Sequence, residues 1–197
     1  RRWRSFRNIK SDAKSDTMGK EIPVHIMIDL ETMGTRPNAP IVSIGAVAFD
    51  SRGVHQDFYR NVSLHSAVNS GAVIDPSTVM WWLGQDKIAQ DALTDKQDEA
   101  IGLEVALREF MQFVCSYGDG LKGVWGNGAS FDNVIMHEAG RRCGVPMWEV
   151  WKDRCYRTIK NCFPVEYKRE GVHHNALDDA RYQACHLIEI NKLHNAL

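Results

Sequence analysis

The sequence lacks the long apolar segments and the paired cysteines that mark membrane-spanning and disulfide-rich proteins. None of its apolar runs approaches the ~20 residues that span a bilayer. The N-terminal segment also lacks the apolar core of a secretory signal. Its five cysteines are odd in number and form no C-x-x-C pair, so neither a disulfide framework nor a zinc ribbon is indicated. We therefore expect a cytoplasmic protein in a reducing setting, with no membrane partner.

The chain also lacks a charge imbalance, internal repeats and low-complexity tracts. Its formal net charge of −1 neither indicates nor excludes nucleic-acid binding, because local patches of charge matter more than the total. The composition, 44% hydrophobic and 25% charged, is that of an ordinary globular protein. We expect one domain that needs no disulfides, since a domain of this length buries roughly 70% of its unfolded surface.

The first twenty residues differ in composition from the rest of the chain. They hold seven Lys or Arg residues against two Asp, with few aliphatic side chains. A basic arm of this kind could bind phosphates through counterion release. Two simpler interpretations are favoured, because short basic tails are weak signals: residues added ahead of a start at Met18, or a linker from an upstream domain. We assign 1–20 as this tail and 21–197 as the globular domain.

From residue 21 onward the pattern predicts a mixed α/β fold. Apolar runs predict strands over 25–31, 41–50 and 54–62, and their short connections indicate an antiparallel meander. Further on we expect a helix near 76–93, an amphipathic helix over 101–118, a strand around 121–126, a helix from about 131, irregular sequence over 150–173 and a last helix over 176–194. Strands followed by alternating helices and strands are typical of a mixed sheet with helices on its faces.

Two acids lie near the end of the first predicted strand. Side chains alternate faces along a strand, so Asp29 and Glu31 project from the same side. Burying two carboxylates side by side costs free energy unless a positive charge compensates them. A hard divalent cation with oxygen ligands is the usual solution. The alternative is that both acids are solvated at the strand end and partly paired with Arg36.

A third acid, Asp132, follows the small-residue loop 127–130 at the start of a predicted helix. A carboxylate in a first helical turn is favoured by the helix dipole, by about 0.3–1 kcal/mol. The loop lets backbone approach a ligand closely, although glycine and asparagine also serve turns for conformational reasons alone. The residue types leave both interpretations open, because Asp132 also fits a plain N-terminal charge.

The segment 173–183 joins a histidine to a fourth acid. His174 precedes the last helix, Asn175 can cap it, and Asp179 falls in its early turns. Asp178 and Asp179 point about 100° apart on a helix, so one of them can readily join a shared site. A histidine beside a carboxylate-bearing helix is a candidate general base, because its pKa lies near neutrality. A lone histidine is more often structural.

Taken together and in this order, the three segments resemble the motifs of the DEDDh 3′–5′ exonucleases, which include proofreading subunits, ribonuclease T and oligoribonuclease. The motif D-x-E-T-x-G stands at 29–34, N-x-x-x-F-D at 127–132 and H-x-A-x-x-D at 174–179. The resemblance runs from about 24 to 190 and selects Asp179 over Asp178 and His174 over His173. Within the superfamily, the sequence looks most similar to phage and prophage exonucleases of the T-even exonuclease A type and to mycobacterial-type exoribonucleases.

The resemblance implies a ribonuclease-H-like fold with a mixed five-stranded sheet and a two-metal mechanism that uses Mg²⁺ or Mn²⁺. Asp29 would bridge both ions, and Glu31 and Asp179 would help hold the ion that binds the attacking water. Asp132 would support the leaving-group side, and His174 would accept a proton from the water. The product would be a nucleoside 5′-monophosphate.

The resemblance also implies contacts with the 3′-terminal nucleotide. These contacts are expected from Thr32, Met33, Gly34, Asn127 and Phe131. A flexible Met side chain against a base would tolerate different bases. Trp82 is our choice for a further stacking surface over its neighbour Trp81, although core packing suits either tryptophan as well.

The substrate stays open at this stage. A DNA exonuclease is slightly favoured over an exoribonuclease that trims single-stranded RNA or 3′ overhangs. RNA specificity requires recognition of the 2′-hydroxyl, and no residue can be assigned to that contact from the sequence. A non-catalytic nucleic-acid-binding module on the same fold is a further alternative. Relatives such as ribonuclease T work as dimers, so a homodimer is possible. The expected setting is the cytoplasm of a bacterial or phage-infected cell.

Overall fold

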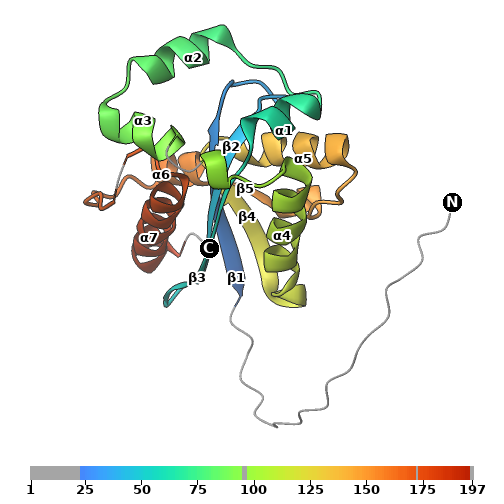
Figure 1. Ribbon diagram of the computed structural model, residues 1–197. Helices are drawn as coiled ribbons and strands as arrows, with labels where there is room; N and C mark the ends of the chain where they lie inside the picture. The colour runs from blue at the N-terminus through green and yellow to red at the C-terminus, as the bar shows by residue number, and fades with distance from the viewer. Residues whose placement is uncertain (1–22, 95–96, 172, 196–197) are drawn as a thin grey trace, which may run out of the picture.

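The computed structural model describes residues 23–94, 97–171 and 173–195 of the chain. The tail assigned to 1–20 lies outside the described residues. The core is a five-stranded mixed sheet with strand order β3-β2-β1-β4-β5 (Figure 1). Its strands are β1 (Val24–Thr32), β2 (Ile41–Asp50), β3 (Gly53–Asn61), β4 (Leu121–Gly126) and β5 (Asp153–Cys155). The first three strands are antiparallel, whereas β4 and β5 run parallel to β1.

Helices cover both faces of the sheet (Figure 1). The α-helices are α1 (Leu64–Asn69), α2 (Pro76–Leu83), α3 (Lys87–Thr94), α4 (Leu103–Cys115), α5 (Asp132–Cys143), α6 (Tyr156–Cys162) and α7 (Ala176–His194), and the short 3-10 turns are η1 (Gln97–Glu99), η2 (Gly118–Gly120) and η3 (Val150–Lys152). Helices α4 and α5 lie on one face, and α6 and α7 on the other. Within the described part of the chain, no helix is both long enough and apolar enough to span a membrane.

Strand β1 divides its side chains between these two layers. Ile26, Ile28 and Leu30 pack into the core beneath α4 and α5. Met27, on the opposite face, packs with the apolar side of α7. Alternation therefore turns Asp29 and Glu31 toward α7 rather than toward the larger core. The two acids lie where the end of β1 meets the start of the last helix.

The start of α7 sits directly on the sheet because β2 has a glycine there. A Cβ atom built on Gly45 would lie 2.1 Å from the carbonyl carbon of Ala176, a distance that real Cβ atoms do not reach. Gly45 is also the β2 residue paired with Asp29. A missing side chain thus lets the first turn of α7 approach Asp29.

The fold class predicted from the sequence is confirmed, including the antiparallel first three strands and the last helix over 176–194. The elements α1, β5 and α6 were not predicted, and the helix expected near 76–93 is divided into α2 and α3. The stretch expected to be irregular over 150–173 contains β5 and α6. These elements have three and seven residues, which is too short for a periodic pattern to reveal.

Candidate active site

A cavity of about 870 Å³ opens where the end of β1, the helix α2 and the start of α7 meet. Its wall includes most of the residues predicted for the site. They are Asp29, Glu31, Thr32, Gly34, Trp82, Asn127, Phe131, His174 and Asp179. Asp132 and Met33 are the two predicted residues outside this wall. The sheet therefore gathers three motifs that are far apart in the sequence.

Three of the predicted acids converge in this cavity. Asp29, Glu31 and Asp179 each offer a carboxylate oxygen, and these oxygens all lie within 4.8 Å of one another. We call these three residues the acid cluster. Glu31 and Asp179 are buried, at 8% and 7% exposed, and Asp29 opens partly onto the cavity. Three carboxylates at this separation repel one another strongly unless protons or cations neutralise them.

Burial and mutual repulsion raise the pKa values of this group. Burial, and then the nearby charge of Asp132, raises the pKa of Glu31 to about 8. The pKa of Asp29 rises well above its usual range, chiefly through burial and then through the charges of Asp132 and Glu31. A hydrogen bond of 2.7 Å from Gln183 Nε2 to Asp29 Oδ1 works in the opposite direction. The ionised acid cluster therefore needs compensating positive charge.

Asp132 lies beneath the cluster rather than within it. It is 1% exposed, and both of its oxygens accept backbone hydrogen bonds. The N–H of Leu30 donates to Oδ1 at 3.2 Å, and the N–H of Asn127 donates to Oδ2 at 2.7 Å. Burial nonetheless raises its pKa to about 6. Asp132 thus ties the backbone between Asp29 and Glu31 to the start of α5.

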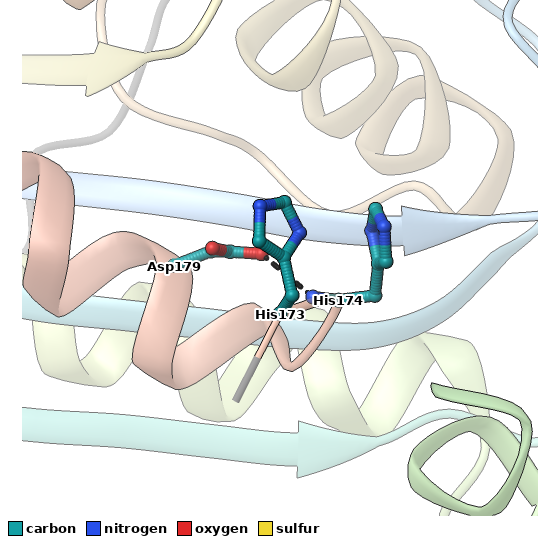
Figure 2. A group of neighbouring side chains, drawn as sticks. All are labelled: His173, His174 and Asp179. Carbon is teal, nitrogen blue, oxygen red and sulfur yellow. Dashed lines mark hydrogen bonds between the residues drawn. The ribbon is translucent and has the colours of Figure 1, made fainter. Parts of the chain in front are cut away.

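The start of α7 is fixed by its own side chains. Asn175 caps the helix, because its Oδ1 accepts hydrogen bonds from the N–H groups of Leu177 and Asp178 at 3.1 and 3.2 Å. Asp179 Oδ2 accepts the backbone N–H of His174 at 3.2 Å (Figure 2). His174 has a φ of 62°, a left-handed conformation that is uncommon for a residue with a side chain. The cap and this turn together hold His174 beside Asp179.

Two histidines stand at the rim of the acid cluster. His173, His174 and Asp179 offer ligand atoms that lie within 4.8 Å of one another (Figure 2). The His174 ring lies edge-on to Trp81 and Trp82, with ring centroids 5.1 and 5.8 Å away. Burial lowers the pKa of His174, and the charges of His173 and Arg169 add to that effect. His174 is thus held in its neutral form, which is the form a general base requires.

The residues expected beneath the 3′ nucleotide divide into two sets. Thr32 and Gly34 line the cavity, and the Thr32 hydroxyl donates to the Gly34 carbonyl at 2.7 Å. The sequence predicts that the Met33 side chain contacts a base, whereas the structure buries this side chain. It is 8% exposed and packs with Val42, Trp82 and Ala89. Strict alternation would put Met33 on the face of Asp29 and Glu31, but it lies beyond the end of β1 and after a register shift between Glu31 and Thr32.

Of the two tryptophans on α2, Trp81 offers more free surface. Trp82, our choice from the sequence, lines the cavity but is 5% exposed, and its Nε1–H donates to the carbonyl of Thr32 at 3.1 Å. Trp81 also lines the cavity and is 46% exposed. Asn127 and Phe131, which also line the cavity, are half-buried.

Sequence reasoning missed several residues of the cavity wall. The principal ones are Tyr156, Arg169, Tyr182 and Gln183. Gln183 lies four residues after Asp179 on α7, so helical spacing could have placed both on one face. Arg169 lies in a segment without secondary structure between α6 and α7, where no periodicity identifies it.

The donor set fits a hard divalent cation. Carboxylate oxygens at mutual contact distance are the ligands that Mg²⁺ and Mn²⁺ prefer. Two buried oxygens of cavity residues have no hydrogen bond within the described part of the chain: Gln183 Oε1, and Asp179 Oδ1, which forms an ion pair with Arg169. Buried oxygens of this kind require a partner. These residues can therefore hold the divalent metal that DEDDh exonucleases use.

The fold is shared with solved nuclease structures. The nuclease domain of 3′hExo, a DEDDh family member solved with rAMP, is 13% identical, with a TM-score of 0.61 over 90% of this chain and 94% of that one. Metal-free E. coli exonuclease I with single-stranded DNA is 12% identical, with a TM-score of 0.62 over 88% and 40% of the two chains. Exonuclease X with 5′ overhanging duplex DNA is 18% identical, with a TM-score of 0.56 over 88% and 94%. This chain therefore spans less than half of exonuclease I.

The fold and the sequence define a nuclease, a 3′–5′ exonuclease of the DEDDh superfamily. More particularly, the chain belongs to the family described as the 3′-5′ exoribonuclease Rv2179c-like domain, whose model matches residues 24–191. The superfamily resemblance inferred from the three motifs is thereby confirmed. Comparison with curated protein sequences finds no match.

Proposed function

We propose that the protein removes nucleotides from single-stranded or frayed 3′ ends and releases nucleoside 5′-monophosphates. The observation that supports this proposal is the acid cluster, with its oxygens within 4.8 Å, on the wall of a cavity that also holds two histidines. Hydrolysis of a phosphodiester places extra negative charge on an already anionic group. A site built to concentrate cations suits that reaction.

The proposed cofactors are two divalent cations, Mg²⁺ or Mn²⁺. Asp29, Glu31 and Asp179 would hold them directly, and Asp132 is proposed as a fourth ligand. Its two backbone hydrogen bonds leave further lone pairs on the carboxylate. Such a pair of ions stabilises the charge that develops on the attacking and leaving oxygens.

His174 is the proposed general base that accepts a proton from the attacking water. Its lowered pKa supports a neutral ring, and the ring lies against those of Trp81 and Trp82. His173 also lies near Asp179 but is exposed, which makes it a matched control. We expect His174→Ala to lower kcat by about 10²–10⁴-fold with metal affinity largely retained, and His173→Ala to have a much smaller effect. Loss of metal from His174→Ala would instead make His174 a ligand.

The cavity dimensions and lining support one terminal nucleotide. Thr32 and Gly34 would contact the sugar and phosphate, while Phe131 and Trp81 offer apolar surface to a base. Aromatic surfaces tolerate different bases because every base has a π-face. The proposed specificity is therefore for an unpaired 3′ end rather than for a sequence.

RNA is the proposed substrate. The motifs alone favour DNA slightly, but the family to which the chain belongs is one of exoribonucleases, which supports RNA. Relatives were solved with rAMP and with DNA, and at 18% identity or less they carry little weight on the sugar. The family match covers this chain's own sequence, so we give it priority.

The test compares matched single-stranded RNA, single-stranded DNA and 3′-overhang duplexes, labelled at either end. We expect a 5′-labelled RNA to shorten stepwise, and a 3′-labelled RNA to release a labelled mononucleotide. Asp29→Asn and Asp179→Asn should abolish this release, whereas Asp178→Asn, beside the site but outside the cavity wall, should retain it. Activity that survives in Asp29→Asn or Asp179→Asn would overturn the site. Faster cleavage of DNA than of RNA would instead support the DNA exonuclease that the sequence slightly favours.

A further inference from the structure

Arg169 extends from the segment between α6 and α7 into the acid cluster. Its Nη2 forms an ion pair with Asp179 Oδ1, and its side chain lines the same cavity. The Arg169 side chain is 28% exposed and that of Asp179 is 11% exposed. A cationic group of this chain therefore stands beside carboxylates that are expected to hold metal.

Arg169 has a second contact besides its ion pair with Asp179. Its guanidinium carbon lies 5.0 Å from the centre of the Tyr182 ring, in a cation–π contact. Within the described residues, its buried Nε and Nη2 atoms and Asp179 Oδ1 have no aligned hydrogen bond. Arginine–carboxylate pairs are frequently bidentate, with two parallel hydrogen bonds. Arg169 is held by one ion pair to Asp179 and by the contact with Tyr182, and its ion pair is the contact that a cation bound at Asp179 would disturb.

The charge of Arg169 contributes to the pKa shifts of three neighbouring residues. It favours the ionised form of Asp29, opposing the rise in the pKa of that carboxyl. It also helps to lower the pKa values of His173 and His174. The contact to Asp179 places this positive charge in the cavity wall, beside the acid cluster.

Asp179 cannot hold Arg169 and a metal with the same oxygen lone pair. Its Oδ2 already accepts the backbone N–H of His174 at 3.2 Å, which leaves Oδ1 as the oxygen paired with Arg169. Each oxygen of Asp179 thus already has one partner, so a cation that takes Asp179 as a ligand shares this carboxylate with the guanidinium. Like charges this close repel as well.

We propose that Arg169 is an internal counterion that neutralises the acid cluster before metal loading and is displaced from Asp179 when a divalent ion binds. The proposal rests on the proposed role of Asp179 as a metal ligand. Arg169 then sets metal affinity: it stabilises the metal-free protein and weakens binding of the ion.

The test measures Mn²⁺ binding by calorimetry and thermal unfolding in EDTA for Arg169→Gln. We expect Mn²⁺ to bind about tenfold tighter, a gain of ~1.4 kcal/mol, and the Tm in EDTA to fall below that of wild type. Arg169→Lys keeps a positive charge and should lie between the two proteins. Arg181→Gln is the matched control, because Arg181 lies on the neighbouring helix α7 but pairs with Asp57 outside the cavity. This variant should bind Mn²⁺ like wild type.

Unchanged or weaker Mn²⁺ binding by Arg169→Gln would overturn the proposal. If Arg169→Gln does not fold, Arg169→Lys decides the question. An Arg169→Lys variant that binds Mn²⁺ with the affinity of wild type, or more weakly, would also contradict the displacement of Arg169 by metal. Asp179→Asn separates this outcome from failure of the proposed function. If Asp179→Asn binds Mn²⁺ as wild type does, the metal site itself is misassigned.

Discussion

Burial and the nearby charge of Asp132 disfavour the ionised form of Glu31. Its pKa of about 8 in the folded protein exceeds the ordinary value of 4.5. Between these two values the folded state retains a proton that the unfolded state has released. Stability therefore falls as the pH rises from 4.5 toward 8, because the slope follows the difference in bound protons between the unfolded and native states.

Glu31→Gln should remove this pH dependence in the metal-free protein. We expect the variant in EDTA to have a higher Tm than wild type at pH 8 and a similar Tm at pH 5, where Glu31 of the folded protein is protonated. Thermal unfolding followed by circular dichroism measures both. Glu189→Gln, which alters a surface pair with Lys192, is the control and should not change the dependence. A Glu31→Gln variant no more stable than wild type at pH 8 would contradict the burial of an ionisable acid here.

At the scale of single elements, α2 supplies both a structural and an exposed tryptophan. Trp82 joins the small cluster of Met33, Val42 and Ala89. Its neighbour Trp81 lies on the cavity wall with 46% of its surface exposed. Adjacent residues on a helix point in different directions, so the two rings cannot have the same role.

Trp81→Ala should weaken substrate binding with little effect on folding. Loss of a base-stacking surface costs about 1–3 kcal/mol, so we expect KM for a single-stranded oligonucleotide to rise at least several-fold, with kcat changed less. Steady-state kinetics and thermal unfolding measure the two effects. Leu83→Ala, an exposed apolar residue of α2 outside the cavity wall, is the matched control. Unchanged KM in Trp81→Ala would assign the base to another surface.

The junction between β2 and α7 depends on a missing side chain. Gly45→Ala would force a Cβ atom to 2.1 Å from the Ala176 backbone, and backbone cannot rotate away as a side chain can. We expect a loss of about 1–3 kcal/mol in unfolding free energy, together with weaker Mn²⁺ binding because Asp179 shifts with the helix. Denaturant unfolding and calorimetry test this. Gly120→Ala, whose new Cβ atom would meet nothing within 4 Å, should change neither quantity. Gly45→Ala with wild-type affinity would show that α7 can move without disturbing the site.

At the scale of the whole molecule, the sequence was informative wherever a regular period or a motif was present. Alternation along β1 placed Asp29 and Glu31 on one face, and the structure turns that face toward α7. Spacing could not reveal that Asp132 would accept the backbone N–H of Leu30, because these two residues are 102 positions apart in the chain. Arg169 lies in an irregular segment, so its approach to Asp179 follows from tertiary structure alone.

The acid cluster connects the first strand of the sheet to the last helix. Gln183 and Asp29, which share the 2.7 Å hydrogen bond, are 154 positions apart in the sequence. A cation bound by Asp29, Glu31 and Asp179 would bridge the same two elements, so its binding energy adds to the stability of the fold as a whole. A ligand at a hundred times its Kd stabilises the folded state by about 2.7 kcal/mol.

Saturating Mn²⁺ should therefore raise the Tm of wild type by roughly 5–10 °C, given about 2–4 °C per kcal/mol for a chain of this size. Differential scanning calorimetry in Mn²⁺ and in EDTA measures the shift. Asp179→Asn should lose most of it, whereas Asp178→Asn should keep it, because Asp178 lies outside the acid cluster and the cavity wall. An equal shift in both variants would mean that Mn²⁺ stabilises the protein from another place, and that the link between β1 and α7 does not pass through Asp179.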